Sequence, residues 1–242
     1  MIKRLLTATI ILLLAALTAG ATRPVLRVTD LNLPLLTRQC AIIEEDVSSY
    51  TYYYFDEQGR ISRMVSVTGS GGDKEHKTSR VYDYPDDKPL IAEVLYISSI
   101  SDDKAAAYVI YDIDQDTGRI TRALRYLPSD DEDDDDTPLV QIYKYDHNDR
   151  IVEMSSAVLG LQLGKEYYTY DRYGNLVKER WESYKDNKLD TWYEVKYILV
   201  YDDKETGSWT AGTKIITMDT GETATYTISR STSIDTDPAT LF

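Results

Sequence analysis

The chain has 242 residues and a formal net charge of −14 at pH 7, with 27 Lys and Arg residues against 41 Asp and Glu residues. So acidic a protein repels phosphate backbones, which excludes nucleic acid as an expected partner. A single cysteine, Cys40, excludes an internal disulfide framework, and 21 Tyr against only 2 Phe indicate half-buried pleated surfaces rather than a conventional deep core.

Residues 1–21 have the pattern of a secretory signal peptide. Lys3 and Arg4 form a short basic region, residues 5–17 are uncharged and mostly apolar, and Ala19-Gly20-Ala21 is a small-residue cleavage site. The apolar run is shorter than the roughly 20 residues that a spanning helix needs. We therefore expect cleavage after Ala21 rather than a retained anchor, and a periplasmic or secreted protein of the bacterial cell envelope.

Residues 22–46 contain Pro24 and Pro34 and are predicted to form an extended N-terminal lead-in. The remainder, residues 47–242, is predicted to be one tyrosine-rich domain of repeated β-hairpins. Residues 129–138 interrupt the hairpins with seven consecutive acids from Asp130 to Asp136, which cannot pair as a strand because like charges would face each other. This segment is predicted to be a loop.

The domain is built on a repeat of the form aromatic, any residue, aromatic, Asp, two residues, Gly or a substitute, Arg or Asn, then Ile or Leu. The clearest copies are residues 53–61, 143–151 and 168–176; degenerate copies occupy 82–90 and 111–120, and a looser one 201–209. The second aromatic position, or its equivalent, recurs every 25 to 32 residues, at 55, 84, 113, 145, 170 and 201. That spacing suits one hairpin and its connection.

The chemistry of the repeat predicts a strand, a tight turn and a return strand. Alternating aromatics favour a strand of period two, and the carboxylate of Asp56 can accept hydrogen bonds from backbone N–H groups in a type I turn. Gly59 suits a turn position with positive φ, and Asp149 can take the same position in another copy. The predicted return strands are 61–67, 90–97, 120–127, 151–158 and 176–184.

Two further strand regions follow towards the C-terminus. Residues 191–202 alternate strictly, with Tyr193, Val195 and Tyr197 on one face and Trp192, Glu194 and Lys196 on the other. A last hairpin is predicted to join 214–218 to 222–229. The fold class is therefore all-β, an antiparallel meander of roughly 12 to 14 strands. It forms an extended or curved sheet, and the sequence leaves open whether the sheet closes into a sandwich or a barrel.

The signature Tyr168-Thr169-Tyr170-Asp171, followed by Gly174-Asn175-Leu176, resembles the YD repeats of RHS-type proteins. The resemblance covers about residues 50–210. It implies secreted or surface-exposed β-structure, as in the toxin-carrying shells and adhesion proteins of that family. The units here are longer and less regular than the family's compact repeat, and the chain is far too short for an enclosing shell. The resemblance therefore implies hairpin geometry and surface location, and no activity.

One short acidic pattern is a calcium candidate. Asp112, Asp114 and Asp116 present alternate carboxylates before Gly118, and hard cations need several oxygen ligands. The pattern departs from the EF-hand, because its Gly is one place late and its twelfth position is Ala123. An acidic hairpin turn explains it better, as a solvated loop explains the run at 130–136. No cofactor is expected otherwise.

The sequence carries no recognisable catalytic signature. His76 and His147 belong to no metal-binding cluster, no nucleophile-elbow sequence is present, and Cys40 is expected to be an inert buried thiol. Pairs of acids suited to glycoside hydrolysis cannot be singled out among 41 carboxylates. We therefore expect a protein that is not an enzyme, with a hydrolase as a minor alternative.

Binding is the expected function, with a glycan or a protein as the unidentified partner. Trp181, Trp192 and Trp209 are the candidate ligand-binding residues, because exposed aromatic rings stack on sugars or anchor a protein. The alternative is a purely structural role, in which these rings only cover the faces of the sheet. A structural or assembly component is the main functional alternative.

An outer-membrane barrel is disfavoured, because many strands carry charges on both faces and Pro238 interrupts the last segment. The preference is thus for a protein that is not integral to a membrane.

Overall fold

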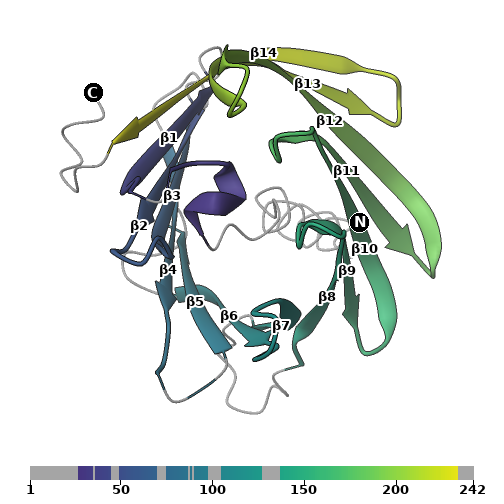
Figure 1. Cartoon of the computed structure of the whole chain (residues 1–242). Coiled ribbons are helices and arrows are strands. Elements are labelled where there is room, and N and C mark those ends of the chain that lie inside the picture. The colour runs from purple at the N-terminus through teal and green to yellow at the C-terminus, as the bar shows by residue number, and fades with distance from the viewer. Residues whose placement is uncertain are drawn as a thin grey trace.

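The strands form one closed antiparallel barrel, viewed in Figure 1 with the strands arranged as a ring. The structure is a computed structural model that describes residues 27–34, 36–44, 49–69, 75–86, 88, 90–97, 105–126 and 137–233. Every strand pairs with its neighbours in sequence, and the first strand pairs with the last to close the ring. The elements are η1 (Val28–Leu31), β1 (Gln39–Glu44), β2 (Ser49–Phe55), β3 (Ile61–Gly69), β4 (Glu75–Asp83), β5 (Leu90–Ile97), β6 (Ala105–Ile113), β7 (Ile120–Tyr126), β8 (Leu139–Tyr145), β9 (Ile151–Val158), β10 (Leu161–Tyr170), β11 (Leu176–Lys185), β12 (Lys188–Asp203), β13 (Ser208–Met218) and β14 (Thr223–Ser233).

The predicted all-β meander is confirmed, and the open question of closure is answered by a barrel. The seam runs from Gln39 opposite Ser233 to Glu44 opposite Ile228. Residues 22–46, expected as a lead-in, contain both the short helix η1 and the seam strand β1. The predicted signal peptide and the acidic run at 130–136 lie outside the described residues.

Strand alternation divides the barrel into an inner and an outer wall. In β12, Tyr193, Val195 and Tyr197 face inwards, where Val195 is buried, whereas Lys196 and Ile198 between and beyond them are exposed. The two predicted faces of this strand are therefore confirmed. The inner wall also holds buried polar side chains that bond to inward tyrosines. The Tyr111 hydroxyl donates to Glu93 at 2.5 Å, and the Tyr168 hydroxyl donates to Glu166 at 2.6 Å.

One end of the barrel is formed by the Asp turns of the repeat, and we call it the Asp-turn end. Asp56 Oδ1 accepts hydrogen bonds from the backbone N–H groups of Gln58 and Arg60, at 2.9 and 2.8 Å. Asp146 caps its own turn in the same way. Gly59 and Asp149 have φ values of 72° and 61°, so the predicted left-handed positions are confirmed.

The repeat also links neighbouring hairpins through its second tyrosine and its arginine. The hydroxyls of Tyr84, Tyr145 and Tyr170 donate to the backbone carbonyls of Ile61, Ile120 and Ile151, the first residues of the preceding return strands. The arginine of each preceding unit lies over the same ring, as with Arg60, 4.3 Å from the centroid of Tyr84. These contacts pack adjacent hairpins at the Asp-turn end and give both residue types of the motif a structural role.

The helix η1 crosses the Asp-turn end and is held on several sides. Arg27 forms a bridge with Arg60, and the carbonyl of Leu31 accepts a hydrogen bond from Arg230 at 3.1 Å. The side-chain amide of Asn32 donates to Asn175 Oδ1 and to the carbonyl of Thr206, both at 3.3 Å. In Figure 1 the purple segment that contains η1 lies within the ring of strands. The segment thus covers part of the barrel interior from this end.

We expect the barrel to lose stability in acid through its Asp turns. Partial burial raises the pKa of Asp56, but the hydrogen bonds and charge of Arg60 outweigh it and hold this pKa below its ordinary value; Arg150 does the same for Asp146. A carboxyl with a lowered pKa in the folded state contributes stability above its unfolded pKa of about 4, and that stability is lost as the pH falls through the folded value.

This acid sensitivity can be measured as the thermal unfolding midpoint between pH 7 and pH 2. The midpoint temperature is expected to decrease once the pH is below about 4. In the variant Asp56→Asn this decrease should be smaller than in the unmodified protein. Identical pH profiles for the two proteins would contradict the assignment to this turn.

Candidate functional site

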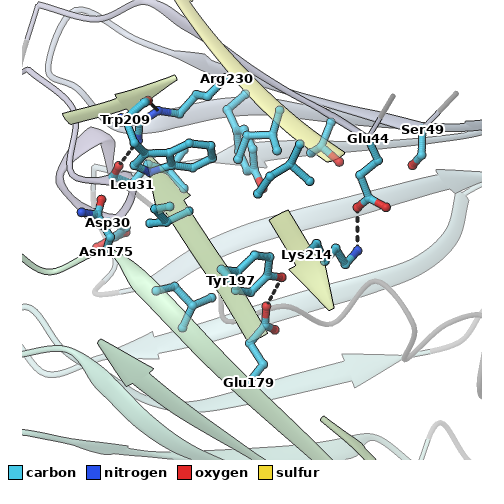
Figure 2. Close-up of a pocket in the computed structure, with 16 residues that line it drawn as sticks. Asp30, Leu31, Glu44, Ser49, Asn175, Glu179, Tyr197, Trp209, Lys214 and Arg230 are labelled. Carbon is cyan, nitrogen blue, oxygen red and sulfur yellow. Dashed lines mark hydrogen bonds and ion pairs between the residues drawn. The ribbon is translucent and has the colours of Figure 1, made fainter. Parts of the chain in front are cut away.

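A cavity of about 170 Å³ lies inside the barrel beneath η1. Figure 2 shows its lining, which comes from η1, from β1 and β2 on one side of the seam, and from β11 to β14 on the other. Apolar side chains make up much of the wall, including Ile42, Leu199 and Ile228. The cavity therefore spans the seam, and closure of the barrel is what brings its two sides together.

The charged and polar groups of this cavity are paired with one another. Lys214 Nζ lies 2.6 Å from Glu44 Oε1, which joins β13 to β1 across the intervening strand β14. The Tyr197 hydroxyl donates to Glu179 Oε1 at 2.5 Å. Both pairs appear in Figure 2 as dashed contacts at the edge of the apolar side chains. A lining of this kind suits a small ligand with one apolar face and a polar edge.

Trp209 forms one end of the cavity together with Arg230. The Arg230 guanidinium lies 4.4 Å from the centroid of the indole ring, and its Nε donates to the Trp209 carbonyl at 2.9 Å. The same guanidinium reaches the Leu31 carbonyl in η1. Trp209 is only 7% exposed, so its ring is fixed between the strands rather than displayed on the surface.

The three tryptophans predicted to bind a ligand lie in three different environments. Trp209 lines the cavity, whereas Trp181 is on the inner wall and stacks on Tyr193 with ring centroids 5.3 Å apart. Trp192 is on the outer wall beneath the guanidinium of Arg180, 4.5 Å from the ring centroid. They do not form one binding surface. Ligand binding by these residues stays a prediction, and Trp209 is the one beside a cavity.

The three aspartates of the calcium candidate do not converge. Asp112 pairs with Arg122 at 2.7 Å, and Asp114 accepts hydrogen bonds from the backbone and the hydroxyl of Thr117. Among the described residues there is no group of three or more His, Cys, Asp or Glu side chains that could hold a metal ion. His147 is exposed in its turn, and Cys40 is fully buried in β1.

The outer wall from β4 to β9 carries a continuous surface of apolar and tyrosine side chains, which we call the apolar belt. Its members are outward-facing and are opposite one another on adjacent strands. Several are well exposed, with 43% for Val81 and 47% for Tyr108. The belt consists of two rows: Val81, Val94, Tyr108 and Tyr126, and Ala92, Ile110, Leu124, Val140 and Ala157.

The outer wall from β8 to β12 is different and carries ion pairs, which we call the charged sector. Lys144 pairs with Glu153 at 2.8 Å, and Lys178 pairs with Glu194 at 2.7 Å. Arg180 and Glu182 are 2.8 Å apart on the same strand, β11. The two regions share β8 and β9 at different heights along the strands, and the Arg122–Asp112 pair borders the belt on β6 and β7.

Comparison with known proteins gives a fold and no family. The fold is similar to that of a porin-like protein from Bacteroides uniformis ATCC 8492, with a TM-score of 0.51 and 10% identity, over 81% of this chain and 98% of that one. A chain of a TcdB2-TccC3-Cdc42 structure matches 81% of this chain and 13% of its own length at 14% identity, but its TM-score of 0.33 is too low to support an argument. No family model and no curated protein matches the chain. At such identities the likeness shows the fold alone, and the YD repeat remains a resemblance of motif.

The preference for a protein that is not integral to a membrane is wrong. The 14 strands of the described residues form a closed barrel whose fold is similar to that of a porin-like protein, and no edge is left open among these strands. Many of the charges that argued against a barrel lie in the charged sector and on the inner wall. The Arg122–Asp112 pair lies on the outer wall beside the apolar belt, but the two rows of the belt contain no charge. In the part of the chain that the structure describes, no helix is long and apolar enough to cross a membrane.

Proposed function

We propose that this chain is a non-enzymatic β-barrel embedded in a membrane of the bacterial cell envelope, and that its interior cavity binds a small amphipathic ligand. The apolar belt carries the first part of the proposal. One of its rows covers β4 to β7 and the other covers β5 to β9, each without a charged member. Asp83 on β4 ends the second row opposite Ala92. Contiguous apolar surface of this kind marks an interface with lipid or protein.

Closure and patterning support the same proposal. The described strands are even in number, antiparallel and closed into a ring. Neighbouring strands of a closed ring can satisfy one another's backbone hydrogen bonds without water, which is the requirement for spanning a bilayer with strands. The inner wall carries the bonded polar side chains of Glu93, Glu166 and Gln141 beside a buried cluster of tyrosines and apolar side chains. Bonded polar groups on the inner wall and an apolar belt on the outer wall are features of membrane barrels.

The charged sector favours a second role as an assembly component. Its paired Lys178 and Glu194 would be poorly placed against lipid, and they suit contact with protein or water. Cross-linking of the barrel in its native envelope, followed by sizing in detergent, tests this role. A barrel that stays strictly monomeric under both conditions contradicts it.

Leu124→Arg should prevent stable insertion of the barrel in the membrane. Leu124 lies in the middle of the belt, with Ile110 and Val140 on either side. An arginine facing lipid near the bilayer centre costs about 2–4 kcal/mol. The measurement is the amount of carbonate-resistant, heat-modifiable protein in the membrane fraction.

Thr169→Arg is the matched control for this variant. Thr169 is an exposed residue of β10 and is opposite Lys178 of the charged sector, so the same new charge should leave insertion unchanged. Equal amounts of membrane-inserted protein for Leu124→Arg and for the unmodified chain would contradict membrane embedding by the belt. Recovery of the unmodified barrel in the water-soluble fraction would contradict it outright.

Trp209→Phe should abolish the fluorescence response to a ligand in the cavity. The probe is a titration of the purified barrel with free mono- and disaccharides, whose apolar ring faces and hydroxyl edges fit the lining. Saturable quenching is expected in the unmodified protein and in Trp192→Phe, because Trp192 lies on the outer wall. Quenching that survives in Trp209→Phe places the ligand elsewhere, and a flat titration with every sugar contradicts sugar binding in the cavity.

A further inference from the structure

We propose that a second cavity, at the Asp-turn end of the barrel, binds a compact oxyanion carried by a phosphate or a carboxylate group. This cavity of about 520 Å³, the mouth site, is bounded by residues 27–32 and by the turns that follow β6, β8 and β10. It shares Asp30 with the interior cavity but is otherwise separate from it. The inference does not depend on membrane embedding or on a ligand beside Trp209.

The mouth site concentrates positive charge on an acidic protein. Four arginines line it, Arg27, Arg119, Arg150 and Arg172, against two aspartates, Asp30 and Asp149. The lining therefore has a formal charge of +2, or +1 when Asp146, which pairs with Arg150 at 2.7 Å, is counted with it, whereas the whole chain has −14. A concave site of one sign attracts ligands of the opposite sign more strongly than an open surface does.

Two of the arginines are held in place by the repeat itself. The guanidinium of Arg119 lies 5.3 Å from the ring centroid of Tyr145, and that of Arg150 lies 4.8 Å from the ring centroid of Tyr170. Both rings are fixed by hydroxyl hydrogen bonds to backbone carbonyls. Guanidinium groups fixed before binding lose little conformational entropy when they take a ligand.

Arg119 retains a donor that the protein does not use. Its Nη2 pairs with Asp149, but its Nε is buried and has no hydrogen-bond partner among the described residues. A buried donor without an acceptor is costly. The Arg119 side chain as a whole is 39% exposed, so a small rotation of its guanidinium would present this donor to an oxyanion in the cavity. Arg150 differs, because Asp146 and the carbonyl of Asp171 already accept its hydrogen bonds. Arg119 is therefore the expected centre of the site, with Arg27 and Arg172 as further cations.

The residue type indicates the class of ligand. Arginine has a planar set of donors that matches the oxygens of carboxylates and phosphates, often with two parallel hydrogen bonds. Thr117 and Asn148 also line the cavity and offer neutral polar groups to the rest of the ligand. The expected ligand is thus a small molecule or headgroup that carries one such anion.

The test is isothermal titration calorimetry of the full barrel in low salt, with inorganic phosphate and separately with glucuronate. A third experiment measures binding to vesicles that contain phosphatidylglycerol, against vesicles of phosphatidylcholine alone. We expect saturable binding of at least one of the three anions, weakened at least tenfold in Arg119→Gln and by added salt. The pattern over the three experiments tells a free phosphate, a free carboxylate and a lipid headgroup apart.

Arg122→Gln is the matched control. Arg122 lies on β7 near Arg119 in sequence, but it faces the outer wall and pairs with Asp112, so its removal changes the net charge equally without touching the mouth site. Binding should stay within about twofold of the unmodified protein. Arg119→Lys, which keeps the charge, serves if the glutamine variant fails to fold. The absence of saturable binding in all three experiments, or equal losses in the Arg119 and Arg122 variants, overturns the proposal.

Discussion

Glu93→Ala is expected to destabilise the barrel by about 3–5 kcal/mol, because it removes the buried carboxylate that pairs with Arg80, whose side chain is only 12% exposed. Glu93 is 1% exposed on the inner wall, 3.4 Å from Arg80 Nη1, and its other oxygen accepts the Tyr111 hydroxyl at 2.5 Å. The variant removes both contacts at once. The measurement is the free energy of unfolding by urea, followed by circular dichroism in detergent.

Glu153→Ala is the control for this result. Glu153 also pairs with a cation, Lys144, but that lysine is 66% exposed on the outer wall and remains solvated after the change. Such exposed pairs contribute about 0–1 kcal/mol. If the two variants lose equal stability, the contacts of Glu93 on the inner wall contribute no more to stability than an exposed ion pair does.

Gly207→Ala is expected to cost about 3 kcal/mol, because the turn between β12 and β13 has no room for a Cβ atom. Gly207 has a φ of 72°, and a Cβ placed there would overlap the side chain of Tyr173. Tyr173 cannot easily move aside, because its hydroxyl donates to the Lys204 carbonyl and its ring packs 5.4 Å from that of Tyr201. The thermal unfolding midpoint should fall accordingly.

Gly221→Ala separates the two causes of that cost. Gly221 also has a positive φ, of 85°, in the turn between β13 and β14, but nothing lies within 4 Å of a Cβ placed there. Only the backbone strain of about 1 kcal/mol then applies. A loss as large as that of Gly207→Ala would show that φ alone decides, and that packing against Tyr173 is unimportant.

The hairpins could be predicted from the sequence because their determinants are local. The Asp56 and Asp149 turns were both expected from a nine-residue motif, and the strand 90–97 agrees with β5 to the residue. Closure could not be predicted, because the pairing of Gln39 with Ser233 joins residues far apart in sequence and leaves no local pattern. The alternation of residues 191–202 predicts which face holds Glu194 and Lys196, but only closure shows that this face belongs to the outer wall.

The candidate sites were beyond sequence reasoning for the same reason. Lys214 and Glu44 face each other across the seam, and nothing near either residue indicates the other. The arginine of the repeat is visible as a pattern in the sequence, because it recurs together with the second tyrosine of the following copy. Its stacking role at the Asp-turn end, as with Arg60 on Tyr84, explains that recurrence. Residue type alone singles out the tryptophans, whereas their three environments depend on which wall each strand position faces.

The seam between β1 and β14 has a consequence for the order in which the barrel assembles. All other strand pairs join neighbours in sequence and can form as soon as each hairpin is made. Until the seam closes, the growing sheet has two open edges, and open edges pair readily with other chains. Aggregation is therefore expected to compete with closure rather than with hairpin formation. Deleting β1 would leave a sheet that keeps most of its hairpins but has unpaired edges at β2 and β14.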